Sequence, residues 1–210
     1  TVTDTPRLAG ILLAAGGSSR LGRPKQLVEI EGQSLVRRVA RNWLDLGSCG
    51  MELLPLTVVA GHASEKVGQQ LVDLPVNVEV CPDWSDGMGA SLAFGAGLVP
   101  REAAGVMVML CDQWRLDSSG LLRLATRWFS DISSICASQW RLENTVLYGP
   151  PCIFPRNKIH ELKCIQKERG AKSLIDRYRD STRFVQLDEA GFDLDTTEDL
   201  VNATGAENQA

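Results

Sequence analysis

The stretch LAGILLAAGGSSRLGRPKQ, residues 8–26, joins a short apolar run to a loop rich in glycine and serine. Residues 8–13 have the length and composition of a buried strand. Glycines that follow such a strand let the chain turn sharply and leave backbone N–H groups open to an anion. The stretch therefore predicts a strand that delivers a ligand-binding loop to one edge of a sheet.

Outside this stretch, short apolar runs alternate with amphipathic segments. The pattern predicts strands at residues 8–13, 56–60, 76–80, 105–110 and 184–187, an extended segment at 132–137, and helices at 34–46, 64–74, 89–98, 116–129 and from 197 onward. Strand-helix alternation indicates an α/β fold with a mostly parallel sheet covered on both faces. Ligands bind such sheets at the carboxyl ends of the strands. We expect a single domain over residues 1–202, a frayed tail over 203–210, and a rigid turn at Gly149 and Pro150.

The composition narrows the class of protein. The chain has 210 residues, 44% of them hydrophobic, and a formal net charge of −4, which argues against nucleic-acid binding. No apolar run approaches the roughly 20 residues of a membrane helix, and the first six residues are polar, unlike a signal peptide. The six cysteines form no C-x-x-C pair and the two histidines are far apart. These features favour a cytoplasmic enzyme with reduced thiols and without a zinc site.

The glycine-rich loop has the groups that bind a triphosphate. Arg20 can form a fork of two hydrogen bonds to phosphate oxygens, and Lys25 supplies a point charge. The backbone expected to line the nucleotide is that of Leu13, Ala14, Ala15, Gly16 and Gly17. The loop is neither a Walker loop nor G-x-G-x-x-G. A solvated loop with a few charges is the alternative interpretation.

A carboxylate follows the most hydrophobic strand expected in the chain. Asp112 comes just after residues 105–110. At the carboxyl end of a strand, beside a phosphate loop, it is suited to bind Mg²⁺ that bridges protein and phosphate. An aspartate that merely forms a turn is the alternative.

These residues carry a family resemblance. Residues 12–27 resemble the opening motif L-A-A-G-x-S-x-R-x-G-x-P-K-Q-L of the molybdenum cofactor cytidylyltransferases, which belong to the wider group of MobA-like NTP transferases. Further segments follow in the family's order at residues 84–92, 111–113, 149–154, 170–172 and 193–200. The resemblance implies a three-layer α/β/α Rossmann-like fold, CTP as the donor and Mg²⁺ as the cofactor. It also implies molybdopterin or the molybdenum cofactor as the acceptor, and a molybdoenzyme or its chaperone as a partner.

The resemblance also implies roles for later residues. Asp195 matches the family's second metal ligand, with Asp193 in reserve, whereas capping of the last helix by Thr196 or Thr197 is the alternative for this segment. The start of the helix near Gly87 and Ser91 would lie over the nucleotide base. For Ser91, a simple N-cap is the alternative.

The acceptor side is matched by Gly149, Pro150 and Lys172. Trp114 departs from the family, in which proline usually follows Cys-Asp-Gln, and Leu21 stands where methionine is usual. The Trp114 indole would either stack on a planar acceptor such as a pterin or pack under the helix that begins near Asp117.

The resulting reaction is a nucleotidyl transfer that releases pyrophosphate, with Arg20, Lys25 and Asp112 as the catalytic residues. Two rival functions remain. One is a cytidylyl- or guanylyltransferase that acts on a sugar or polyol phosphate. The other is a nucleotide-binding delivery protein without catalysis.

Overall fold

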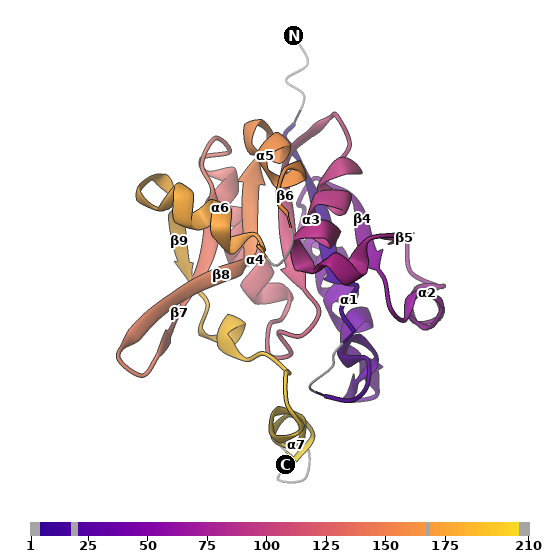
Figure 1. The fold of residues 1–210 in the computed structure, drawn as a ribbon. Coiled ribbons are helices and arrows are strands. Elements are labelled where there is room, and N and C mark those ends of the chain that lie inside the picture. Colours follow the sequence, from indigo (N-terminus) through magenta and orange to yellow (C-terminus); the bar gives the residue numbers. More distant parts are fainter. Residues whose placement is uncertain (1–4, 18–20, 167–168, 206–210) are drawn as a thin grey trace.

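The computed structural model of the protein describes residues 5–17, 21–166 and 169–205. A seven-stranded sheet forms its centre, with the strand order β5-β4-β1-β6-β8-β7-β9 (Figure 1). Its strands are β1 (Arg7–Ala14), β4 (Leu53–Ala60), β5 (Val76–Val80), β6 (Ala103–Leu110), β7 (Cys136–Leu142), β8 (Thr145–Pro155) and β9 (Arg183–Gln186). A separate hairpin pairs β2 (Glu29–Ile30) with β3 (Gln33–Ser34).

The strands β5, β4, β1 and β6 pair in parallel, and β8 runs antiparallel between β6 and β7. The helices are α1 (Leu35–Ser48), α2 (Ser64–Leu71), α3 (Met88–Gly97), α4 (Ser118–Phe129), α5 (Ile159–Lys163), α6 (Lys172–Arg177) and α7 (Thr197–Gly205). The 3₁₀ turns are η1 (Lys25–Leu27), η2 (Trp84–Asp86), η3 (Arg156–Lys158), η4 (Arg179–Ser181) and η5 (Asp188–Gly191). The predicted mostly parallel sheet is confirmed.

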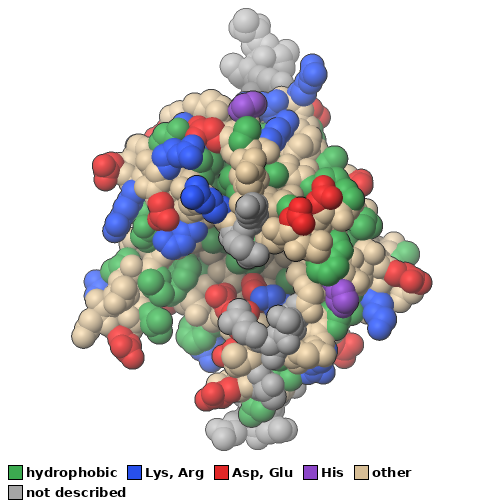
Figure 2. All heavy atoms as spheres, in the orientation of Figure 1, with side chains coloured by type: hydrophobic (Ala, Val, Ile, Leu, Met, Phe, Trp, Pro, Cys, Tyr) green, Lys and Arg blue, Asp and Glu red, His purple; other side chains and the backbone are tan. Residues whose placement is uncertain are grey.

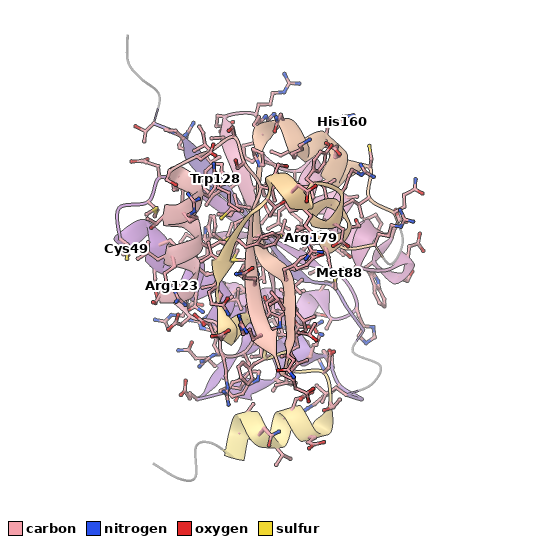
Figure 3. The ribbon with its side chains drawn as sticks, turned by 90° about the vertical axis from the view of Figure 1, so that its left-hand side faces the viewer. Cys49, Met88, Arg123, Trp128, His160 and Arg179 are labelled. Atoms are coloured by element: carbon pink, nitrogen blue, oxygen red, sulfur yellow. The ribbon has the colours of Figure 1, made fainter. Side chains whose placement is uncertain are left out.

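Alternation along β1 divides the interior into two layers. Leu8 and Leu12 belong to the cluster that packs against α1 and α4, whereas Ile11 and Leu13 belong to the cluster that packs against α3, α5 and α6. The period of two residues in a strand sends successive side chains to opposite faces. Both faces of the sheet are therefore covered by helices (Figures 1 and 3), which confirms the expected three-layer arrangement.

The predicted turn at Gly149 and Pro150 is wrong. Both residues lie inside β8, and the register with β7 shifts so that Ala137 faces Cys152 whereas Ser138 faces Gly149. The two prolines between these pairs form a bulge, where a missing N–H breaks no ladder hydrogen bond. The extended segment expected at 132–137 begins as a strand only at Cys136.

A third apolar cluster lies at the carboxyl edge of the sheet. Val28, Ile30 and Leu35 from the β2–β3 region pack there against Leu194 and Ala203, so that α7 closes over the hairpin. The helix α7 continues to Gly205, past the start of the expected tail, and residues 206–210 lie outside the described part. In the described residues, no helix is both long and apolar enough to cross a membrane.

Candidate active site

The strand β1 ends at Ala14, and the glycine-rich loop begins directly at this carboxyl edge. Gly16 and Gly17 are exposed, whereas Gln26 is almost fully buried and donates from Nε2 to the Gly16 carbonyl at 3.2 Å. This hydrogen bond fastens the start of the loop to the η1 turn. Arg20 lies outside the described residues.

Lys25 lies between two carboxylates. Its ammonium group donates to Oδ2 of Asp112 and, over 3.0 Å, to Oδ1 of Asp195. Burial by itself would lower the pKa of Lys25, but the charge of Asp112 and hydrogen bonds to both carboxylates raise that pKa above its ordinary value. The ammonium group therefore stays protonated at neutral pH.

Backbone pairing brings the two carboxylates together, although they are far apart in the sequence. Leu194 donates its N–H to the Asp112 carbonyl at 2.9 Å, and Trp114 donates its N–H to the Phe192 carbonyl at 3.2 Å. Gln113 and Asp193 form the antiparallel bridge between these two bonds. The loop after β6 thus holds the segment that carries Asp195.

The same segment also starts α7. Asp199 accepts hydrogen bonds from the Thr196 N–H at 2.8 Å, and the Thr196 hydroxyl accepts one from the Asp199 N–H at 3.2 Å. This reciprocal cap is the alternative role predicted for the segment. Because the cap uses Thr196 and Asp199, the side chain of Asp195 stays directed at Lys25.

The acidic pair fits a magnesium ion. Oδ1 of Asp112 is buried and accepts no hydrogen bond from any described residue, so a hard acceptor atom is left for another donor or a cation. Within the described residues no group of three or more metal-binding side chains occurs. Mg²⁺ commonly takes one or two carboxylates and completes its shell with water and substrate phosphates. Asp112 and Asp195 match that requirement.

Two neighbours of the pair have shifted acidities. Partial desolvation is the largest cause that raises the pKa of Asp193 to about 7, and the negative charges of Asp112 and Asp195 add to it. The residue as a whole is nevertheless exposed. Burial raises the pKa of the Cys111 thiol to about 12. Cys111 is therefore a neutral thiol at physiological pH and no thiolate nucleophile.

Lys25 and its two carboxylate partners line a cavity of about 470 Å³. In Figure 2 acidic and basic side chains meet in a hollow below the centre of the face shown. Asp112 and Asp195 line the cavity together with the predicted nucleotide-binding residues Leu13, Ala14, Ala15, Gly16, Gly17, Lys25, Gly87 and Ser91. The N-cap of α3 is Gly87, so the alternative that Ser91 caps this helix is wrong.

The residues expected on the acceptor side lie beside this cavity and do not line it. The Pro150 carbonyl accepts a hydrogen bond of 2.8 Å from Nε2 of Gln113, the neighbour of Asp112. Lys172 donates to Asp176 at 3.1 Å and lies over the ring of Tyr148. Its loop reaches the cavity edge, because a Cβ added at Gly170 would lie 3.0 Å from Sδ of Met88 (labelled in Figure 3).

Trp114 packs against the third apolar cluster, with Leu194 and Leu200. The Arg115 guanidinium lies over its ring, 4.7 Å from the ring centre. This environment of Trp114 differs from the predicted packing under α4. The reason is the backbone bridge at Gln113, which turns the following residue toward the C-terminal segment.

Sequence reasoning assigned no role to several other cavity residues. They are Leu21, Trp84, Ser85, Met88, Leu110 and Cys111. Trp84 is the one aromatic side chain that the described residues contribute to the cavity wall. A signal for it exists in Gly61, whose missing side chain leaves the space that the indole fills.

Known proteins resemble this chain in sequence. Nicotine blue oxidoreductase of Paenarthrobacter nicotinovorans is 35% identical over 123 residues, which is 58% of this chain and 57% of the relative. A probable molybdenum cofactor guanylyltransferase of Bacillus cytotoxicus is 29% identical over 119 residues, or 56% of this chain and 55% of the relative. The chain thus spans little more than half the length of either relative.

A solved structure matches over nearly the whole chain. Rv0371c from Mycobacterium tuberculosis H37Rv superposes with a TM-score of 0.77 at 26% identity, covering 97% of this chain and 100% of the other. Residues 10–182 match the model of the MobA-like NTP transferase domain. The match confirms the resemblance at the level of this wider group and does not distinguish cytidylyl from guanylyl transfer. This chain belongs to the family of MobA-like NTP transferase domains.

Proposed function

We propose that the protein transfers CMP from CTP to the phosphate of molybdopterin or the molybdenum cofactor, with Mg²⁺ as cofactor, and releases pyrophosphate. One observation carries the proposal. Lys25 lies between Asp112 and Asp195 in the cavity below the glycine-rich loop, and one oxygen of Asp112 has no described donor. A cation next to a carboxylate pair, beside the exposed glycines of a loop, suits a triphosphate with its metal.

In the proposed reaction, an oxygen of the acceptor phosphate attacks the α-phosphorus, and the bond to the β-phosphate breaks. Lys25, Arg20 and the amides of Gly16 and Gly17 hold the β- and γ-phosphates and stabilise the leaving pyrophosphate. Mg²⁺ held by Asp112 and Asp195 supplies positive charge at the α-phosphate when it is bound. The acceptor phosphate is already ionised near neutral pH, so the protein needs no general base.

The acceptor site is proposed at the edge beside Pro150, Gly149 and Lys172, with Trp114 as a further contact. The hydrogen bond from Gln113 to Pro150 supports this position, because it links the strand β8 to the residue next to Asp112. Gly170, which lies just before α6, supports it too, since it approaches Met88 at the cavity wall. Lys172 would pair with the acceptor phosphate after releasing Asp176.

The preference for CTP is proposed from Ala15, which stands where guanylyl-transferring relatives carry glycine. Ala15 lines the cavity, is 4% exposed, and accepts a hydrogen bond from the His62 N–H at 3.2 Å. Its methyl group reduces the room available to a purine. Comparing CTP and GTP in a calorimeter, each with Mg²⁺, tests this preference, and tighter GTP binding would refute it.

The name of the Paenarthrobacter relative makes an oxidoreductase the competing class. One experiment separates the classes. The protein is mixed with Mg²⁺, molybdopterin and each nucleoside triphosphate in turn, and pyrophosphate is measured, while a parallel sample with NADH or NADPH and a dye acceptor follows nicotinamide absorbance. We expect pyrophosphate with CTP and no change in absorbance. Further samples replace molybdopterin by a sugar phosphate or a polyol phosphate. Pyrophosphate release only in these samples would favour a nucleotidyltransferase for such an acceptor. CTP binding without pyrophosphate release from any acceptor would favour a delivery protein without catalysis.

A further inference from the structure

The indole of Trp84 fills the space between three loops at the cavity wall. It is half-buried and lines the cavity from the η2 turn. A Cβ added at Gly61 would lie 2.6 Å from Cγ of Trp84, and one added at Gly17 would lie 3.6 Å from Cζ3. The ring therefore packs closely against the loop after β4 and lies near the glycine-rich loop after β1.

The loops around Trp84 hold it in place. The His62 N–H donates to the Ala15 carbonyl at 3.2 Å, and the Cys81 N–H donates to the Ala60 carbonyl at 2.9 Å. The His62 ring adds a tilted contact, with its centre 5.4 Å from that of the indole. An aromatic side chain that is fixed before its ligand arrives loses little conformational entropy on binding.

The order of the strands gives the cavity two chemically different ends. The strand β4 lies on one side of β1 and β6 on the other. Lys25 and the two carboxylates gather at the β6 side, where the loop holding Asp112 begins. Trp84 lies against the end of β4, and Gly87 and Ser91 are the nearby start of α3. A nucleoside triphosphate has the same asymmetry, with charged phosphates at one end and a flat base at the other.

We propose that Trp84 is the platform on which the donor base stacks. The inference rests on the proposed nucleotidyltransferase function and adds a binding residue to it. Stacking accepts any base, because every base presents a π-face, so Trp84 would contribute affinity for the nucleoside and leave selection between bases to other residues. Base stacking on an aromatic ring corresponds to roughly a 5- to 150-fold change in affinity on removal of the ring.

Two substitutions at Trp84 test the proposal. Trp84→Leu keeps apolar volume but has no ring, and Trp84→Phe keeps a ring. Calorimetry measures the binding of CTP with Mg²⁺ and of inorganic tripolyphosphate with Mg²⁺ to both variants and the wild type. We expect Trp84→Leu to bind CTP at least about tenfold more weakly, Trp84→Phe to stay within about threefold of the wild type, and tripolyphosphate to bind all three alike.

Tryptophan fluorescence supplies a test that needs only the wild type and the phenylalanine variant. CTP should quench the wild-type emission more than tripolyphosphate does, and this difference should vanish in Trp84→Phe, which still binds CTP. Equal CTP affinity in Trp84→Leu, or a parallel loss of CTP and tripolyphosphate, would overturn the stacking role and leave Trp84 as a support for the loops. Failure of the wild type to bind any nucleoside triphosphate would refute the proposed function itself.

Discussion

Lys25 lies where a metal ion would contact the carboxylate pair, so removing its charge should change metal and nucleotide binding in opposite directions. If Mg²⁺ shared the pair with the ammonium group at a separation of about 4 Å, their repulsion would reach roughly 8 kcal/mol at an effective dielectric of 20. This repulsion opposes joint occupancy of the pair. We expect Lys25 to leave Asp112 and Asp195 when the metal binds.

The cost of that departure follows from the contacts of Lys25. It gives up two ion pairs, with side-chain exposures of 21% for Lys25, 10% for Asp112 and 35% for Asp195. Allowing roughly 1 kcal/mol for each pair, because water screens them in part, gives about 2 kcal/mol. Lys25→Met avoids this cost and should bind Mn²⁺ roughly 30-fold more tightly than the wild type without nucleotide. The same variant should bind CTP more weakly, since a phosphate ligand is lost.

Electron paramagnetic resonance of free Mn²⁺ measures the metal affinity, and calorimetry measures that for CTP. Lys158→Met is the matched control, because Lys158 also has a side-chain exposure of 21% and pairs with a carboxylate, that of Glu161, at 3.0 Å. The control should leave Mn²⁺ affinity unchanged. Equal or weaker Mn²⁺ binding by Lys25→Met would refute the competition between ammonium and metal.

Three further variants test other parts of the account. Asp112→Asn should lower pyrophosphate release at least about 100-fold in a coupled assay while circular dichroism shows an intact fold, because it removes the charge that holds the metal; near-normal release would remove Asp112 from the metal site. Gly105→Ala should lower the urea midpoint by the equivalent of about 1–3 kcal/mol, since its Cβ would lie 2.5 Å from Cζ2 of Trp128, and an unchanged midpoint would show that the core yields. Trp114→Pro loses the N–H bond to Phe192 and the indole, so it should melt at lower temperature and raise the acceptor KM while CTP affinity stays unchanged; a lower melting temperature with an unchanged acceptor KM would leave Trp114 with a packing role alone.

The N-terminal half of the fold could be predicted from the sequence, because buried parallel strands leave continuous apolar runs. Residues 8–13, 56–60 and 105–110 lie in β1, β4 and β6. The strand β8 escaped prediction, since Gly149 and two prolines are typical of a turn. The bulge that accommodates them depends on the partner strand, which no local pattern reveals.

The residues of the candidate site were likewise predictable only in part. The glycine-rich loop and Asp112 follow apolar strands, so their place at the carboxyl edge could be inferred from the residues alone. Asp195 came only from the family resemblance. The backbone hydrogen bond from Leu194 to Asp112 helps to set its position, and such a bond depends little on side-chain identity. Trp84 was missed because the polar residues and glycine after it are typical of an ordinary loop.

Transfer of labelled phosphate tests the central claim most directly. CTP carrying ³²P at the α-position, and separately at the γ-position, is incubated with Mg²⁺, molybdopterin and the protein, and the products are separated by chromatography. We expect the α-label to move to molybdopterin and the γ-label to pyrophosphate, and we expect neither product with Asp112→Asn. Release of the γ-label as inorganic phosphate, or an α-label that never reaches the acceptor, would contradict it.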